Sequence, residues 1–92
     1  MYIAVCDDQL EELNEIFALL QLWQTENNTI LRVRTFRSAV ELVDAAQREH
    51  FTLYLLDVIM PGMDGLEAAR EIRSFDTAAD IVFLTSSPGF AY

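Results

Sequence analysis

The sequence predicts an α/β fold in which helices cover both faces of a doubly wound parallel sheet. Short apolar runs that end in polar residues alternate with stretches whose apolar residues recur at helical spacing, in the order β-α-β-α-β-α-β. Strands separated by amphipathic helices favour right-handed crossovers and therefore a parallel sheet. The length of 92 residues allows one domain, residues 1–92.

The first part of the chain predicts a central strand, a helix and an edge strand. Residues 2–6 form an apolar run followed by two acids, which is typical of a buried strand. Asp8 and Glu11 have the spacing of a capping box, so Asp8 could be the N-cap of a helix that ends near 26–28. The apolar stripe of this helix is Leu10, Leu13, Phe17, Leu20 and Trp23. Residues 29–36 alternate between apolar side chains and arginines, which suits an edge strand.

Two more helices are predicted to open with the same capping spacing, Ser38 with Glu41 and Asp64 with Glu67. The residues expected to face inward on them are Ala39, Val40, Leu42, Val43 and Ala46 on one, and Leu66, Ala69 and Ile72 on the other. Two further buried strands are expected, at 51–57 and 81–84. The first of these delivers Asp57 to its C-terminal end, immediately before a Pro-Gly turn.

The charge balance limits the function classes. The net charge is −9, from 15 acids against 6 bases, and every base is an arginine. Such a surface repels nucleic acid and anionic membranes, so direct binding to either is not expected. Cys6 is the single cysteine, which fits a reducing cytoplasm, and the acids beside it should raise its pKa and make it unreactive. No apolar run reaches the length needed to span a bilayer, and no signal peptide is evident.

Acidic and hydroxyl side chains follow three of the predicted strands. Asp7 and Asp8 follow the first, Asp57 ends the third, and Thr85 follows the fourth. In a parallel sheet these strand ends lie on one side, so the side chains converge if the three strands are neighbours. Each acid alone could be a turn or cap residue. Three carboxylates packed together repel one another, and a divalent cation with oxygen ligands, such as Mg²⁺, would neutralise them.

This set of residues resembles the receiver domain of two-component response regulators. The resemblance rests on Asp7-Asp8, Asp57, the run Met60-Pro61-Gly62-Met63-Asp64-Gly65, and Thr85, and it covers the whole chain. It implies a flavodoxin-like (CheY-like) sheet of strand order 2-1-3-4-5, which would place the arginine-bearing second strand at an edge. The Asp-Asp pair and the Met-Pro-Gly-Met-Asp-Gly run also resemble those of receivers attached to a LytTR-type DNA-binding domain.

The resemblance also implies a role for each matched residue. Asp57 would accept a phosphoryl group from a sensor histidine kinase. Asp8 would ligate Mg²⁺ directly, Asp7 would act through metal-bound water, and the backbone carbonyl of Ile59 would be a further ligand. Thr85 would contact the phosphoryl oxygens and move with them. A carboxylate nucleophile that forms an acyl phosphate is reasonable chemistry in its own right.

The sequence departs from the family pattern near its end. Receivers have a fifth strand and helix and a lysine after the fifth strand, whereas this chain stops at Tyr92 and contains no lysine. The expectation is a piece of a longer regulator that lacks the fifth strand and helix, with the output DNA-binding domain elsewhere in the parent protein. Self-association through the uncovered strand 81–84 is also expected.

Two other functions fit parts of the sequence. A haloacid-dehalogenase-type phosphatase also uses an aspartyl phosphate, but it places its nucleophile in an Asp-x-Asp run after the first strand, whereas Asp7 and Asp8 are adjacent. A receiver-like module kept only for interaction or dimerisation would not need the complete set of acids, but the absence of a lysine leaves this alternative open for this chain. The leading hypothesis is therefore a signalling module, not an enzyme.

Overall fold

The computed structural model describes residues 1–84, which form four strands and three helices. In chain order the elements are β1 (Tyr2–Cys6), α1 (Leu10–Glu26), β2 (Arg32–Phe36), α2 (Ala39–Ala46), β3 (Leu53–Asp57), α3 (Gly65–Arg73) and β4 (Asp80–Leu84). Thr85 lies outside the described residues. None of the helices in this part of the chain is both long and apolar enough to cross a membrane.

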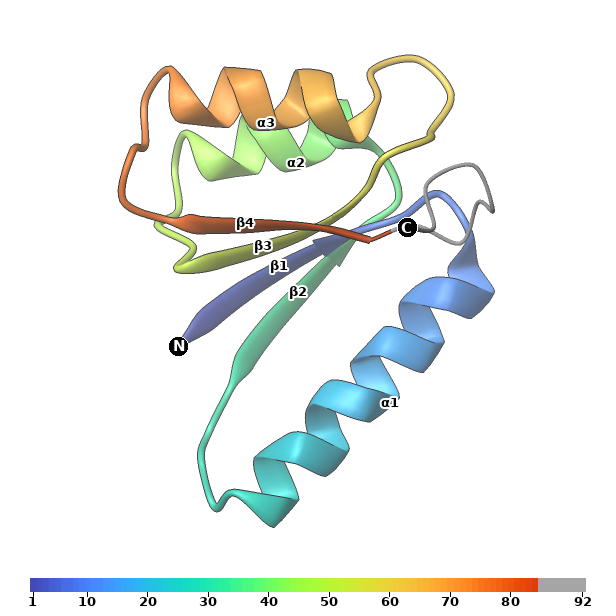
Figure 1. Cartoon of the computed structure of the whole chain (residues 1–92), viewed down its shortest axis with the longest axis vertical. Coiled ribbons are helices and arrows are strands. Elements are labelled where there is room, and N and C mark those ends of the chain that lie inside the picture. Colours follow the sequence, from blue (N-terminus) through green and yellow to red (C-terminus); the bar gives the residue numbers. More distant parts are fainter. Residues whose placement is uncertain (85–92) are drawn as a thin grey trace.

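The sheet is parallel throughout, with the strand order β2-β1-β3-β4. Helices α2 and α3 cover one face and α1 lies against the other, as Figure 1 shows. This arrangement confirms the predicted doubly wound sheet and the edge position of β2. The two central strands, β1 and β3, are the ones that end in the predicted acids.

The two faces of the sheet are covered unequally. The larger core lies under α2 and α3, where Leu42, Tyr54, Leu56 and Ile72 are buried. Under α1 the buried residues are Ile3, Val5 and Leu13. Side chains from α1, β2 and β3 that pack against these three residues are only partly buried, so α1 covers its face of the sheet less completely than α2 and α3 cover theirs.

The first turn of α1 differs from the sequence-based expectation. The helix begins at Leu10, its N-cap is Gln9, and no side chain caps it, so the predicted Asp8–Glu11 capping box is wrong. The turn is instead closed by Asp7, whose Oδ1 accepts a hydrogen bond from the Gln9 backbone N–H at 2.9 Å. An aspartate that bonds two residues ahead in this way competes with capping from the next position.

Several apolar residues that were expected to face inward are exposed. Leu10, Phe17 and Trp23 on α1, Val40 on α2 and Leu66 on α3 all lie substantially in solvent. Strand β4, expected to be buried, is also partly open, with Val82 46% and Phe83 42% exposed. For the helices, periodicity shows which side chains lie on one face, but burial also depends on how far the neighbouring layer extends. The same limit applies to β4, because an apolar run does not show whether another layer covers it.

The other two helix starts agree with the sequence. The Ser38 hydroxyl accepts from the Glu41 backbone N–H at 3.4 Å, and Asp64 with Glu67 forms both halves of a capping box. Strands β2 and β3 begin two or three residues later than the predicted 29–36 and 51–57.

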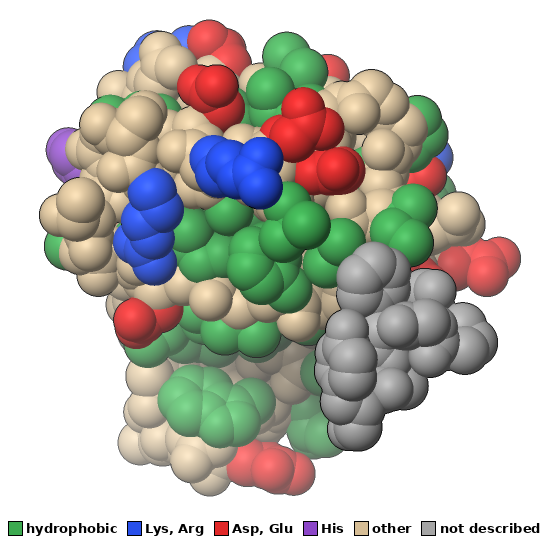
Figure 2. All heavy atoms as spheres, turned by 45° about the horizontal axis from the view of Figure 1, so that its top comes forward, with side chains coloured by type: hydrophobic (Ala, Val, Ile, Leu, Met, Phe, Trp, Pro, Cys, Tyr) green, Lys and Arg blue, Asp and Glu red, His purple; other side chains and the backbone are tan. Residues whose placement is uncertain are grey.

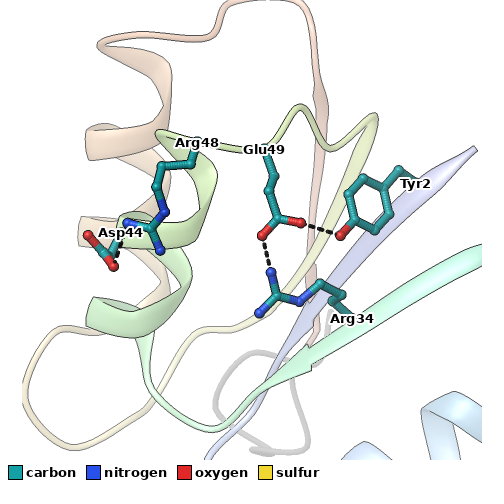
Figure 3. Close-up of polar contacts among 5 residues, drawn as sticks. All are labelled: Tyr2, Arg34, Asp44, Arg48 and Glu49. Atoms are coloured by element: carbon teal, nitrogen blue, oxygen red, sulfur yellow. Dashed lines mark hydrogen bonds and ion pairs between the residues drawn. The ribbon is translucent and has the colours of Figure 1, made fainter.

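A polar cluster joins the end of α2 to the sheet (Figure 3). Glu49 accepts hydrogen bonds from the Tyr2 hydroxyl on β1 and from the Arg34 guanidinium on β2. Nearby, Arg48 pairs with Asp44 at 2.9 Å. Exposed ion pairs contribute at most about 1 kcal/mol each, so this cluster orients the connection between α2 and β3 more than it stabilises the fold.

A shallow groove lies between α3 and β4. Its floor and rim are formed by Leu66, Ala69, Arg70, Arg73, Ile81 and Phe83. Figure 2 shows apolar side chains gathered beside basic ones on this face of the molecule. The groove lies on the β4 side of the sheet, away from β2.

Candidate functional site

The site is built by the ends of the two central strands. Cys6 on β1 pairs with Leu56 on β3, so the residues that follow, Asp7 and Asp57, leave the sheet side by side. Both carboxylates are buried, with Asp7 2% and Asp57 8% exposed. Buried charges are costly unless they are paired or bind a metal, so two neighbouring acids at this depth indicate a functional site.

The segment after Asp57 folds back against the strand end. The backbone N–H of Gly65 donates to the Val58 carbonyl at 3.0 Å, which ties the start of α3 to the start of the loop. A Cβ on Gly65 would lie 2.0 Å from the Asp57 carbonyl oxygen, so only glycine permits this approach. Gly62, with φ +74°, makes the turn in between. Asp64 therefore caps the start of α3, and Gly65, its first residue, braces the Asp57 backbone.

A third carboxylate joins the site from the first turn of α1. Carboxylate oxygens of Asp7, Glu12 and Asp57 all lie within 4.8 Å of one another. Glu12 was not among the residues predicted from the sequence. The signal that could have found it is its position in the first turn of the helix that follows the acid pair.

The other predicted residues stand in different relations to this cluster. Asp8 is not a member of it, although its charge raises the pKa of Asp57. The backbone N–H groups of Val58 and Ile59 hydrogen-bond the Asp57 carboxylate. Metal ligation by Asp8 and by the Ile59 carbonyl stays a prediction, and the predicted role of Thr85 falls outside the described residues.

The surroundings of the site make the ionised forms of Asp7 and Asp57 less favourable than in water, which raises the pKa of both carboxyl groups. Burial, followed by a hydrogen bond with Glu12, raises the pKa of Asp7 to about 7. Burial also raises the pKa of Asp57, helped by the charges of Glu12 and Asp8 and opposed by the Ile59 and Val58 N–H groups. A divalent cation would reverse this preference, because it stabilises the ionised carboxylates.

The donor set suits a hard cation. The clustered side chains offer only carboxylate oxygens, which are the ligands that Mg²⁺ prefers, and the cluster is small enough to share one ion. The nearby thiol of Cys6 is not expected to act as a further ligand of the cation. Burial raises the pKa of Cys6 to about 12, with further contributions from Asp7 and Asp57, and its Sγ lies 3.7 Å from the Met60 sulfur. The prediction of an unreactive Cys6 thiol agrees with this pKa.

Comparison with solved structures identifies the same fold in two bacterial regulators. Over 97% of this chain and 72% of the other, it is similar to the response regulator TrrA of Thermotoga maritima in complex with Mg²⁺ and BeF, with 30% identity and a TM-score of 0.74. Over 96% of this chain and 72% of the other, it is similar to the chemotaxis protein CheY4 of Vibrio cholerae, with 25% identity and a TM-score of 0.77.

Sequence comparison gives relatives of the same kind. The chain is 39% identical over 59 residues to the response regulator receiver protein CpdR of Brucella abortus, which covers 64% of this chain and 47% of CpdR. It is 31% identical over 77 residues to the uncharacterized transcriptional regulatory protein YkoG of Bacillus subtilis, covering 84% of this chain and 33% of YkoG. The chain thus spans a third to a half of the length of these relatives.

A family model matches more of the chain than either of these two relatives does. The model described as the response regulator receiver domain matches residues 3–89, nearly the whole sequence. It covers both acid-bearing strand ends as well as the loop between β3 and α3. This chain belongs to the response regulator receiver domain family.

Proposed function

We propose that this chain is a signalling module that accepts a phosphoryl group on Asp57 from the phosphohistidine of a sensor histidine kinase. The observation that carries the proposal is the position of Asp57, a buried carboxylate at the end of β3 within 4.8 Å of two other carboxylates. In the reaction, an Asp57 carboxylate oxygen forms a bond to phosphorus and the P–N bond to the kinase histidine breaks. The imidazole leaves with the electron pair of that bond and takes up a proton.

Different residues around Asp57 hold its carboxylate, its backbone and the proposed cation. Two backbone N–H groups, from Val58 and Ile59, fix the carboxylate, and the Gly65 brace fixes its backbone. Asp57, Asp8, Asp7 through water, and the Ile59 carbonyl are the proposed holders of Mg²⁺. When bound, Mg²⁺ offsets the negative charge between the carboxylate and the incoming phosphoryl group. The Mg²⁺ and BeF complex of the related TrrA supports this choice of ion.

The proposed partners follow from the same family membership. The kinase is the phosphodonor, and an output domain that binds DNA, of LytTR or another type, receives the signal in the parent regulator. We place this exchange in the cytoplasm. In this proposal the module does not turn over a substrate, and the family match does not favour the phosphatase alternative.

The experiment is phosphorylation by acetyl phosphate with Mg²⁺, followed by intact-mass spectrometry. The native chain should gain one phosphoryl group, and Asp57→Asn should gain none. Asp64→Asn is the matched control, because Asp64 is a half-buried acid outside the carboxylate cluster that caps α3, and asparagine caps equally well. Equal labelling of the native chain and Asp57→Asn would overturn the proposal.

A further inference from the structure

The first turn of α1 carries two adjacent glutamates that occupy different surroundings. Glu11 is exposed to solvent, whereas Glu12 is half-buried and its carboxylate lies within 4.8 Å of those of Asp7 and Asp57. Glu12 is also hydrogen-bonded to Asp7. The next residue, Leu13, is the one fully buried side chain of the helix and fixes its rotation against the sheet. That rotation is what directs Glu12, and not Glu11, to the strand ends.

Helix electrostatics alone do not account for this arrangement. An acid in the first turn interacts favourably with the helix dipole by about 0.3–1 kcal/mol, and this holds equally for Glu11 and Glu12. The hydrogen bond between Glu12 and Asp7 requires a proton on one of the two carboxyl groups, and when both are ionised Glu12 adds repulsion that an exposed rotamer would avoid. The close approach therefore suits a site that holds positive charge during function.

The size of the cluster is right for one divalent cation. Octahedral Mg²⁺ binds oxygens at about 2.0–2.1 Å, so two of its ligands are separated by about 3–4 Å. Oxygens within 4.8 Å of one another can share the ion directly or through one of its bound waters. Mg²⁺ ordinarily keeps several waters in proteins, so either form of contact is chemically suitable.

We propose that Glu12 is an additional carboxylate of the divalent-cation site, and that it strengthens cation binding by the unphosphorylated chain. This proposal rests on the proposed function, because the cation is the one that Asp57 requires. It goes beyond the acid pair and Asp57 by assigning a role to a residue on α1. Through Glu12, the position of α1 is linked to the occupancy of the site.

The test is isothermal titration calorimetry of the metal-free chain with MgCl₂. The variants are Glu12→Gln, Glu12→Ala, Glu11→Gln as the matched control on the same helical turn, and Asp57→Asn. Circular dichroism of each variant verifies that it folds. Removing groups around a metal site typically weakens binding about 10–100-fold, so both Glu12 variants should bind Mg²⁺ about tenfold more weakly. Glu11→Gln should stay within about twofold of the native chain, because its carboxylate lies outside the cluster.

The outcomes separate this proposal from the one on which it rests. Weaker binding by the Glu12 variants with native-like binding by Glu11→Gln supports the role of Glu12. Binding that is lost in Asp57→Asn but unchanged in the Glu12 variants overturns that role and leaves the proposed function intact. If the native chain binds no Mg²⁺, both the role of Glu12 and the metal-dependent part of the proposed function are wrong.

Discussion

Replacing Gly65 with alanine tests how tightly the fold braces Asp57. A Cβ at this position would lie 2.0 Å from the Asp57 carbonyl oxygen, 2.9 Å from its carbonyl carbon and 3.1 Å from the Val58 Cα. Ordinary carbon–oxygen contacts are about 3.3 Å or longer, so the atoms must separate by roughly 1 Å. All three neighbours are backbone atoms, and no side-chain rotation can relieve the contact. The strain therefore falls on the end of β3 or on the start of α3.

The expected cost is a few kcal/mol. Overpacking that shifts backbone costs typically about 1–3 kcal/mol. A loss of about 2 kcal/mol would lower the melting temperature of a domain of this size by roughly 8–16 °C. Because the displaced atoms belong to Asp57, the stabilisation of the chain by Mg²⁺ should fall as well. Thermal unfolding by circular dichroism, with and without MgCl₂, measures both effects.

Gly62→Ala is the matched control in the same loop. Its φ of +74° disfavours alanine, but a Cβ there meets no atom of the described part of the chain within 4 Å. The cost is conformational alone, about 1–2 kcal/mol, and the Mg²⁺ response should survive. If Gly65→Ala were no less stable than Gly62→Ala and kept its full Mg²⁺ response, the proposed brace of Asp57 would be refuted.

Three further predictions follow from other parts of the structure. Tyr54→Phe should leave stability unchanged or raise it in urea unfolding, because the buried Tyr54 hydroxyl has no hydrogen-bond partner among residues 1–84; a loss above about 1 kcal/mol would contradict this. Because the folded-state pKa of Asp7 is raised from 3.8 to about 7, the metal-free chain should lose stability as pH rises through that interval; unfolding midpoints that are flat between pH 5.5 and 8 would contradict this. The exposed Val82 and Phe83 on β4 should promote self-association that strengthens with salt, as salt screens the charge of −9; sedimentation equilibrium giving a 10.5 kDa species at low and high salt would exclude it.

The sequence was sufficient to predict the sheet and the acids at its strand ends. Apolar runs that stop at Asp7 and Asp57 are a local signal, and parallel topology then brings those residues together without further information. Capping at Asp64 was equally local, because the residues of the motif are three positions apart.

What the sequence could not predict depends on contacts between layers. The entry of Glu12 into the site requires the rotation of α1 about its axis, which the burial of Leu13 sets. The exposure of Trp23 depends on how far the sheet extends beneath α1, and no periodicity reports that distance. The predicted cap at Asp8 fails because α1 begins at Leu10 with Gln9 as its N-cap, and the Gln9 N–H donates to Asp7. In each case the local sequence pattern is compatible with more than one arrangement, and contacts with the rest of the fold determine which one forms.

The central claim is that Asp57 itself carries the phosphoryl group, and chemical trapping tests it most directly. Borohydride reduces an aspartyl phosphate to homoserine, which marks the modified residue permanently. After incubation of the native chain with acetyl phosphate and Mg²⁺, reduction and peptide mass mapping should place homoserine at position 57. Homoserine at Asp7, Asp8 or Asp64, or at no position in a chain that binds Mg²⁺, would contradict the assignment.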